Sequence, residues 1–258
     1  MISVLAGNWK MNGSKNDLNV WFKDFFEKAI DFEKNNIIKE VPTILICVPS
    51  IYIDYASKLA EEYNKKTDKL KVSIGGQDCH YEDKGAFTGN TSPLFLNEFG
   101  CKFVIVGHSE RREYEKETND LVAKKSVNAI KNSLTPLICV GESLEIREAK
   151  KQLEFIEKQV IESVKDIDLN KAIIAYEPVW AIGTGKVPSL DDIEEINSHI
   201  KSVVAKEFGI KNIKVLYGGS VKSSNIDGIS KLKSVDGVLV GGASLKGEEF
   251  FNIYKNSL

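Results

Sequence analysis

The chain has 258 residues and a formal net charge of -2, with 42% hydrophobic and 28% charged residues. This composition is typical of a folded globular protein, and the small net charge gives no reason to expect nucleic acid or an anionic membrane as a partner. The length suits two ordinary domains or one large α/β barrel of about 250 residues.

The cysteines do not suggest cross-links or a metal site. None of them forms a C-x-x-C pair, and a chain of this length can bury a core without disulfides, so we expect reduced thiols and a cytoplasmic location. The apolar run at residues 1–6 lacks a preceding basic segment, which predicts no signal peptide. No stretch reaches the roughly 18 apolar residues that predict a transmembrane helix. The four cysteines are Cys47, Cys79, Cys101 and Cys139.

Short apolar runs recur along the chain. Most are continuous rather than alternating, and they are rich in Val and Ile. Strands that are covered on both faces, as in a parallel sheet, have this pattern. We predict eight strands, at residues 4–8, 43–48, 72–75, 103–107, 137–141, 172–177, 214–218 and 237–241.

Longer amphipathic segments lie between these strands. Residues 18–26 place apolar side chains at helical spacing, and residues 150–164 and 193–208 alternate apolar and charged residues with the same period. We expect Ser189 to begin the capping segment of the helix that contains residues 193–208, and Gly209 to end that helix. Strand followed by helix, eight times, indicates parallel βαβ units.

Eight such units close most simply into a single (β/α)8 barrel of the α/β class. A doubly wound open sheet is the alternative, but that fold usually carries Gly-x-Gly-x-x-Gly after its first strand, and this chain has Gly7-Asn8-Trp9-Lys10 there. No linker or low-complexity segment divides the chain. We therefore predict one domain over residues 1–258.

Unusual polar residues cluster at the carboxyl ends of the predicted strands, which converge at one mouth of a barrel, where such enzymes carry out chemistry. Glu177 ends the sixth strand, where a carboxylate can face a cleft and act as a base. His108 follows the fourth strand and can precede a short helix, whose dipole favours a neutral imidazole. Lys10 follows the first strand and can neutralise a phosphate or form a Schiff base.

Each of these three residues also has an ordinary structural explanation. Glu177 can pair with a cation at the barrel rim, and His108 can be a hydrogen-bonded structural histidine. Lys10 can extend along the surface with its ammonium group in solvent. The argument for a site is therefore the convergence of several strand ends, not any single residue.

Two further features suggest a ligand with a phosphate group. The connection at residues 178–189 is longer than the roughly 2–6 residues usual in α/β units, and its apolar start predicts a lid that closes over something. Glycines at residues 218–219 and 241–242 follow the last two strands, where main-chain amides can approach a phosphate. Glycines at these positions are also compatible with tight turns alone.

Five segments resemble the motifs of the triosephosphate isomerase family, in the family's order and over nearly the whole chain. They are NWKMNG at residues 8–13, GHSERR at 107–112, YEPVWAIGTGK at 176–186, YGGSV at 217–221 and VGGASL at 240–245. The resemblance implies a cofactor-free and metal-free enzyme of glycolysis and gluconeogenesis. It would interconvert dihydroxyacetone phosphate and D-glyceraldehyde 3-phosphate by proton transfer through an enediolate.

The resemblance also implies roles for individual residues. Glu177 would be the base, His108 the neutral electrophile and Lys10 a source of positive charge. Asn8 would help to bind substrate, and Glu110 would be a supporting carboxylate. The implied phosphate contacts are Gly183, Ser220, Gly241 and Gly242, with Tyr217 and Ser220 holding the closed lid. The implied lid residues are Pro178, Val179, Trp180, Ala181, Ile182, Gly183, Thr184, Gly185 and Lys186.

The family is usually a homodimer, and the loop from Gln77 to Ser92 resembles its interface loop. Asn90 stands where the family usually has a glutamate, which weakens an expected ionic contact with Arg111. Pro188 replaces the usual alanine at the far hinge of the lid, and because proline fixes φ we expect altered lid motion.

Three other functions fit parts of the sequence. Lys10 is compatible with a Schiff-base aldolase, which borohydride would trap covalently with its substrate. A non-catalytic barrel that binds phosphosugars would not need Glu177, His108 and Lys10 together. A barrel that serves only as a scaffold for partner proteins leaves the predicted lid and the glycines unexplained.

Overall fold

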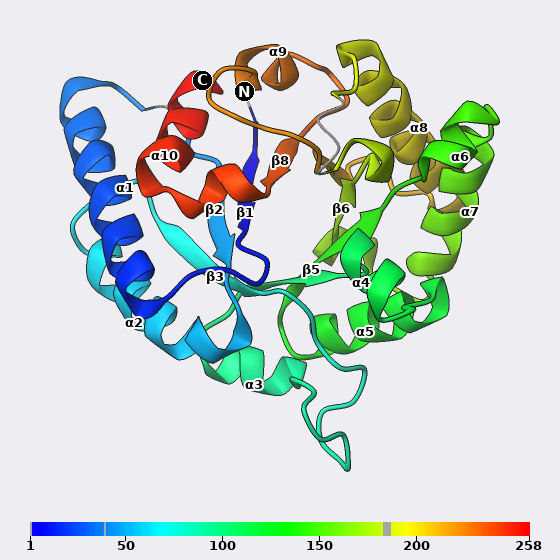
Figure 1. The fold of residues 1–258 in the computed structure, drawn as a ribbon, viewed down its shortest axis with the longest axis horizontal. Coiled ribbons are helices and arrows are strands. Elements are labelled where there is room, and N and C mark those ends of the chain that lie inside the picture. Colours follow the sequence, from blue (N-terminus) through cyan, green and yellow to red (C-terminus); the bar gives the residue numbers. More distant parts are fainter. Residues whose placement is uncertain (1, 39, 183–186) are drawn as a thin grey trace.

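The computed structural model of the chain describes residues 2–38, 40–182 and 187–258. Its eight parallel strands follow one another around a closed barrel in chain order (Figure 1). All eight predicted strands are present with ends within two residues of the prediction, so the barrel is confirmed over the open sheet. The strands are β1 Val4–Asn8, β2 Thr43–Cys47, β3 Val72–Gly76, β4 Phe103–Val106, β5 Thr135–Val140, β6 Ile173–Tyr176, β7 Lys214–Tyr217 and β8 Gly237–Val240.

A helix follows every strand and lies on the outside of the barrel (Figure 1). The α-helices are α1 Lys15–Asn35, α2 Ile53–Asn64, α3 Pro93–Glu98, α4 Ser109–Tyr114, α5 Asn119–Lys131, α6 Leu144–Glu148, α7 Gln152–Ser163, α8 Leu190–Phe208, α9 Ile226–Ser230 and α10 Gly247–Asn256. Short 3-10 turns occur at η1 Ser50–Tyr52, η2 Leu169–Lys171, η3 Val179–Ala181 and η4 Gly242–Leu245. Within the described ranges, no helix is both long enough and apolar enough to span a membrane.

The predicted caps of α8 are confirmed. The Ser189 side chain accepts from the Asp192 amide, and the Asp192 side chain accepts in return from the Ser189 amide, which completes a capping box. Gly209 ends the helix with a φ of 71°, in the left-handed region that favours glycine.

The barrel closes where β1 lies between β2 and β8. Val4 is in register with Thr43 on one side and with Gly237 on the other. A Cβ atom at Gly237 would come within 2.2 Å of the Val4 carbonyl oxygen, so a larger residue at this seam would push the two strands apart.

Apolar side chains fill the barrel interior and, separately, the space between barrel and helices. Because side chains alternate along a strand, Ala6 on β1 and Ala175 on β6 face the interior, and so do positions two residues further on. Those positions are Asn8 and Glu177, which places both at the carboxyl mouth. The buried interior residues are Val4, Ala6, Leu45, Cys47, Ile105, Leu137, Cys139, Ile173, Ala175, Leu216 and Leu239.

Helix α1 packs an aromatic face against the barrel, as its spacing predicts. Trp21 stacks on Phe25 with ring centroids 5.0 Å apart, and both side chains are buried. The Trp21 indole N–H also donates to the Ser244 carbonyl oxygen at 2.9 Å. The first helix therefore fixes η4, the turn that follows the last strand.

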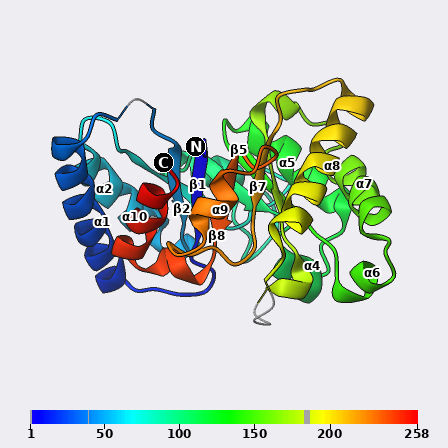
Figure 2. The ribbon, with the colours of Figure 1, turned by 90° about the horizontal axis from the view of Figure 1, so that it is seen from above.

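The loop from Gln77 to Ser92 projects beyond the ring of helices near α3 (Figure 1). Contacts within the loop hold it together, because the His80 amide donates to the Thr91 carbonyl at 2.8 Å and the His80 ring packs against the rings of Tyr81 and Phe87. In the view turned by 90°, the chain termini lie on one side of the barrel and α4 and α6 on the other (Figure 2). The carboxyl ends of the strands open on the side of α4 and α6.

Candidate active site

A strained turn at the end of β1 brings Lys10 into the mouth. Lys10 has a φ of 53°, which costs a residue with a side chain about 1–2 kcal/mol. The Asn8 side-chain oxygen accepts from the Lys10 amide at 2.9 Å, and the Gln77 side chain donates to the Lys10 carbonyl at 2.8 Å. The Lys10 ammonium then lies 2.5 Å from Glu110 Oε1. Its side chain also passes Gly241, with Cε 3.7 Å from the position of a Cβ there.

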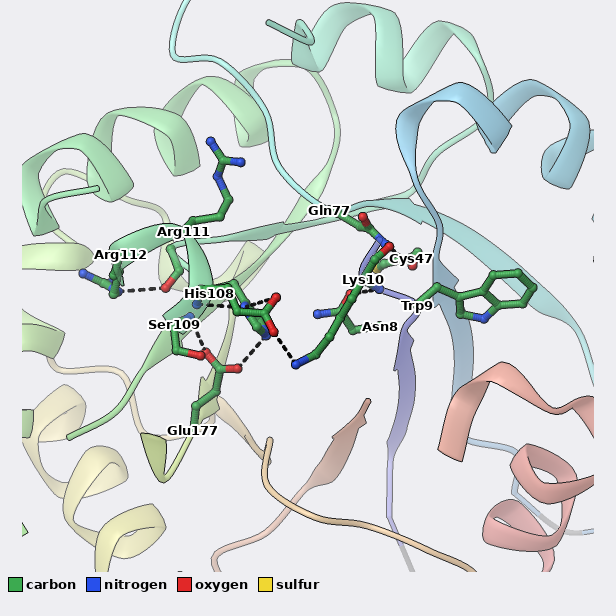
Figure 3. Close-up of polar contacts among 12 residues, drawn as sticks. Asn8, Trp9, Lys10, Cys47, Gln77, His108, Ser109, Arg111, Arg112 and Glu177 are labelled. Carbon is green, nitrogen blue, oxygen red and sulfur yellow. Dashed lines mark hydrogen bonds and ion pairs between the residues drawn. The ribbon is translucent and has the colours of Figure 1, made fainter. Parts of the chain in front are cut away.

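His108 and Glu177 are in direct contact at the centre of the site. His108 Nε2 lies 2.8 Å from Glu177 Oε1, and their side chains are only 7% and 3% exposed. The second carboxylate oxygen accepts from the Ser109 amide at 2.9 Å. Both oxygens of Glu177 are thus held by consecutive residues at the start of α4 (Figure 3).

The hydrogen bonds of His108 favour one tautomer. His108 is the N-cap of α4, and its Nδ1 accepts from the Glu110 amide at 3.2 Å. A proton on Nδ1 would displace that amide, so the arrangement fits a ring that carries its proton on Nε2 and donates it to Glu177. Because α4 begins at Ser109, the short helix predicted after His108 is confirmed.

Burial and pairing shift the pKa values of His108 and Glu177 in opposite directions. Burial alone lowers the pKa of His108, but the carboxylates of Glu177 and Glu110 outweigh it, and the pKa is raised. Burial likewise raises the pKa of Glu177, but His108 and the Ser109 amide outweigh it, and the pKa is lowered. The contact thus favours an ionised Glu177, the form that can accept a proton.

The start of the predicted lid is anchored to a buried carboxylate that the sequence analysis did not single out. Glu142 Oε1 accepts from the Trp180 indole N–H at 2.8 Å and from the Tyr176 hydroxyl at 3.1 Å. Arg147 lies 3.5 Å from the same oxygen, over the Trp180 ring, and also pairs with Asp192 on α8. Burial raises the pKa of Glu142. Glu142 directly follows Gly141, just beyond the end of β5, and this position at a strand end is the signal in the sequence that could have identified it.

The described part of the predicted lid is partly packed rather than solvated. Val179–Ala181 form η3, in which Ala181 is buried and the Val179 and Trp180 side chains are half-buried. Pro188 is buried at the far end, and Val187 beside it is 63% exposed. Gly183, Thr184, Gly185 and Lys186 lie outside the described residues.

The glycines after β7 and β8 differ in the space around them. A Cβ at Gly219 would lie 2.2 Å from the buried Tyr217 hydroxyl, so Gly219 permits a close turn over that ring. A Cβ at Gly242 would meet nothing within 4 Å, which leaves its backbone open. Ser220 is exposed, and Gly241 is half-exposed beside the Lys10 side chain.

The structure brings the five predicted catalytic residues to one mouth from three strand ends. Lys10 contacts Glu110, Glu110 Oε2 lies 3.6 Å from His108 Nδ1, and His108 contacts Glu177. Asn8 is 5% exposed beneath Lys10. In residues 2–38, 40–182 and 187–258, no group of three or more His, Cys, Asp or Glu is arranged to hold a metal ion.

Arg111, which the sequence analysis related to Asn90, is paired within its own chain. Its guanidinium lies 3.0 Å from Asp78 and 2.5 Å from Glu117, and Lys125 contacts both of these carboxylates. The two cations and two carboxylates balance one another. This cluster ties the loop from Gln77 to Ser92 to α5.

A (β/α)8 barrel with a buried carboxylate, an imidazole and an ammonium group at its carboxyl mouth defines an acid–base enzyme. The family model described as triosephosphate isomerase matches residues 3–257. The triosephosphate isomerase of Psychromonas ingrahamii is 40% identical over 98% of both chains, and that of Lactobacillus delbrueckii subsp. lactis is 40% identical over 94% of this chain and 93% of the relative.

A crystal structure of triosephosphate isomerase from Bartonella henselae superposes with a TM-score of 0.85 at 34% identity, over 99% of each chain. The chain belongs to the triosephosphate isomerase family. Its activity is the aldose–ketose isomerisation that gives the family its name, a reaction of glycolysis and gluconeogenesis.

Proposed function

We propose that Glu177 is the base that moves the proton between the two carbons of the triose phosphate. The observation that carries this assignment is the buried contact of Glu177 with His108 at 2.8 Å, with Lys10 at the same mouth. A buried carboxylate that is ionised by its neighbours can accept a proton from a carbon next to a carbonyl. The conjugate acid then returns the proton to the adjacent carbon.

The other polar groups stabilise the charge that develops on the substrate oxygens. His108 donates from Nε2, because the Glu110 amide occupies Nδ1. A glutamate base with a neutral histidine is the known pattern of triosephosphate isomerase itself. The neutral state of His108 stays a prediction, since its pKa is raised by pairing with Glu177. Lys10 supplies positive charge, held in place by Glu110 and Asn8.

The phosphate contacts and the lid are assigned from the family motifs. Ser220, Gly241 and Gly242 lie after β7 and β8, where barrel enzymes bind phosphate, and the Gly242 backbone has open space in front of it. Gly183 would complete this set from the lid, and Tyr217 would meet the closed lid together with Ser220. The anchor of Trp180 on Glu142 supports a lid that pivots from a fixed start.

We also propose that the enzyme works as a cytoplasmic homodimer that joins through the loop from Gln77 to Ser92. Phe87 and Tyr81 on this projecting loop are each 37% exposed, which favours burial against a second copy. Arg111 is already neutralised by Asp78 and Glu117, so the interface does not need a partner carboxylate at position 90. Sedimentation of the wild type and of Phe87→Glu tests this, since a wild-type monomer would contradict it.

The test of the base is turnover of glyceraldehyde 3-phosphate without added metal or nucleotide. Glu177→Asp withdraws the carboxylate by about one ångström, and we expect kcat to fall by about 10²-fold with little change in KM. Glu113→Asp makes the same change at an exposed residue of α4 and should leave kcat unchanged. Equal turnover by both variants would refute the assignment of Glu177, and covalent trapping of substrate on Lys10 by borohydride would favour the aldolase.

A further inference from the structure

Arg112, on α4, links the ends of β4 and β5. Its Nε donates to the Gly107 carbonyl at 2.7 Å, and its Nη2 donates to the Cys139 carbonyl at 3.0 Å. Gly107 directly precedes His108. Cys139 lies on β5 next to Val140, whose carbonyl accepts from the Glu177 amide at 2.7 Å. The Arg112 side chain lies beside the segment that carries His108 and Ser109, on the side away from Lys10 (Figure 3). One guanidinium therefore binds the residue before His108 and the β5 residue next to the one that holds the Glu177 amide.

The remaining contacts of Arg112 are also to neutral groups. Its Nη1 donates to Asn119 Oδ1 at 2.6 Å, and its Nη2 donates to Ser163 Oγ at 3.2 Å. Across residues 2–38, 40–182 and 187–258, no carboxylate is in ion-pair contact with it. A planar fork with several fixed donors suits this set of acceptors, which a lysine could not satisfy together.

The charge of Arg112 is therefore left to act at longer range. Burial lowers the pKa of Arg112, and Cys139, Glu177 and Glu117 oppose that shift. Glu117 is already contacted by Lys125 and Arg111. Glu162 reaches Arg112 only through the Asn119 side chain, and its own side chain is 46% exposed to screening solvent.

Glu177 differs from Glu117 and Glu162 in the charged groups that surround it. Its titratable and charged neighbours are His108 after β4, Cys139 on β5 and, through His108, Glu110 on α4 and Lys10 after β1. Within the part of the chain that the structure describes, His108 is the one cationic side chain in direct contact with it. When His108 acts as a neutral donor, as the reaction requires, Arg112 is a cation held nearby: it donates to the Cys139 carbonyl, and the next carbonyl on β5, that of Val140, accepts from the Glu177 amide at 2.7 Å.

We propose that Arg112 is a positioning residue with two separable effects: its fork fixes the turn that presents His108 to Glu177, and its charge keeps Glu177 ionised. This proposal rests on Glu177 and His108 as the base and the electrophile. The fork contributes geometry and the charge contributes electrostatics, so substitutions that keep one and remove the other distinguish them.

Three variants separate the two effects. Arg112→Lys keeps the charge and loses the fork, whereas Arg112→Gln loses both. Ser163→Ala removes two hydrogen bonds, one accepted from Arg112 and one donated to Asn119, and leaves the charge of Arg112 and its two backbone contacts intact, so it is the matched control. We would measure kcat, KM and the pH profile of kcat/KM for each. The substrate phosphate titrates identically in every variant, so a displacement between profiles belongs to the enzyme.

The two effects predict different results. We expect kcat to fall by about 10²-fold in Arg112→Lys and in Arg112→Gln, because small displacements of a reacting group have effects of this size. In Arg112→Gln alone the acid limb of the profile should also move to higher pH by about one unit, the lower end of the shift that a nearby charge causes. Ser163→Ala should keep both kcat and the acid limb of the wild type.

Two outcomes would overturn the proposal in part. Wild-type kcat in Arg112→Lys would refute the role of the fork, and coincident acid limbs in Arg112→Lys and Arg112→Gln would refute the role of the charge. If Arg112→Gln does not fold, Arg112→Met replaces it, and a carbon-13 titration of the Glu177 carboxylate compares Arg112→Met with Arg112→Lys: a higher midpoint in Arg112→Met supports the charge effect, and equal midpoints contradict it. Failure of the proposed base is recognised separately, because Glu177→Asp would then retain activity while the Arg112 variants lose it.

Discussion

Lys125 provides a sharp test of the buried charges on α5. Its side chain is 5% exposed, and its ammonium contacts Glu117 and lies 2.7 Å from Asp78. Burial raises the pKa of Asp78. Burial also opposes ionisation of Glu117, but Lys125 and Arg111 hold its pKa below the ordinary value. The cluster is therefore sensitive to the loss of either cation.

Lys125→Met removes the charge and keeps most of the alkyl chain, so the change is electrostatic rather than a cavity. Breaking a buried ion pair typically costs about 3–5 kcal/mol because a charge is left uncompensated. Arg111 still contacts Asp78 at 3.0 Å and Glu117 at 2.5 Å after the change. We therefore expect the lower end of that range, about 3 kcal/mol of unfolding free energy.

The assay is urea denaturation followed by circular dichroism at fixed protein concentration, because dissociation of a dimer would contribute to the midpoint. Lys124→Met is the control: Lys124 is the preceding residue of the same helix, 60% exposed and paired with Asp120, and its midpoint should not move. Lys125→Met/Glu117→Gln restores the charge balance and should recover most of the loss. Equal midpoints for Lys124→Met and Lys125→Met would refute the reasoning.

Three further predictions follow from buried groups. Glu142→Gln weakens the acceptor that holds the Trp180 indole N–H, so we expect a change in Trp180 fluorescence, measured against a Trp180→Phe background. An unchanged spectrum would show that Glu142 does not hold the start of the proposed lid. Burial raises the pKa of all four cysteines, of Cys101 to about 12, so a disulfide reagent at pH 8 should label the folded protein slowly and the denatured protein at four thiols. Rapid labelling of the folded protein would count against this. The pKa of Glu177 is lowered, so the stabilisation that Glu177 contributes is present above its unfolded pKa and is lost as pH falls through its folded pKa. The pKa of His108 is raised, so the stabilisation that His108 contributes is present below its unfolded pKa and is lost as pH rises through its folded pKa. The difference in unfolding midpoint between wild type and Glu177→Gln should therefore be largest between about pH 4.3 and 6.5, and a constant difference from pH 5 to 9 would contradict the pairing.

The sequence by itself determined the strands, the main helices and the positions of the reactive side chains. Short continuous apolar runs rich in Val and Ile favour strands that are covered on both faces, and helical spacing indicates which side of α1 and α8 is buried. The period of two along a strand then puts Asn8 and Glu177 on the interior face at the mouth. These features depend on neighbours a few residues away, so they can be predicted without knowing how distant segments meet.

Only the tertiary structure decided which charged groups pair. Glu142 receives the Trp180 indole across 38 residues, and Lys125 meets Asp78 across 47. Arg112 joins the ends of β4 and β5 through bonds to backbone carbonyls, which leave no pattern in the sequence. Such contacts depend on the spacing and direction of loops that the barrel brings together. A charged residue in a loop has the same sequence context whether it ends in solvent or beside a buried partner, so its role becomes visible only in the folded chain.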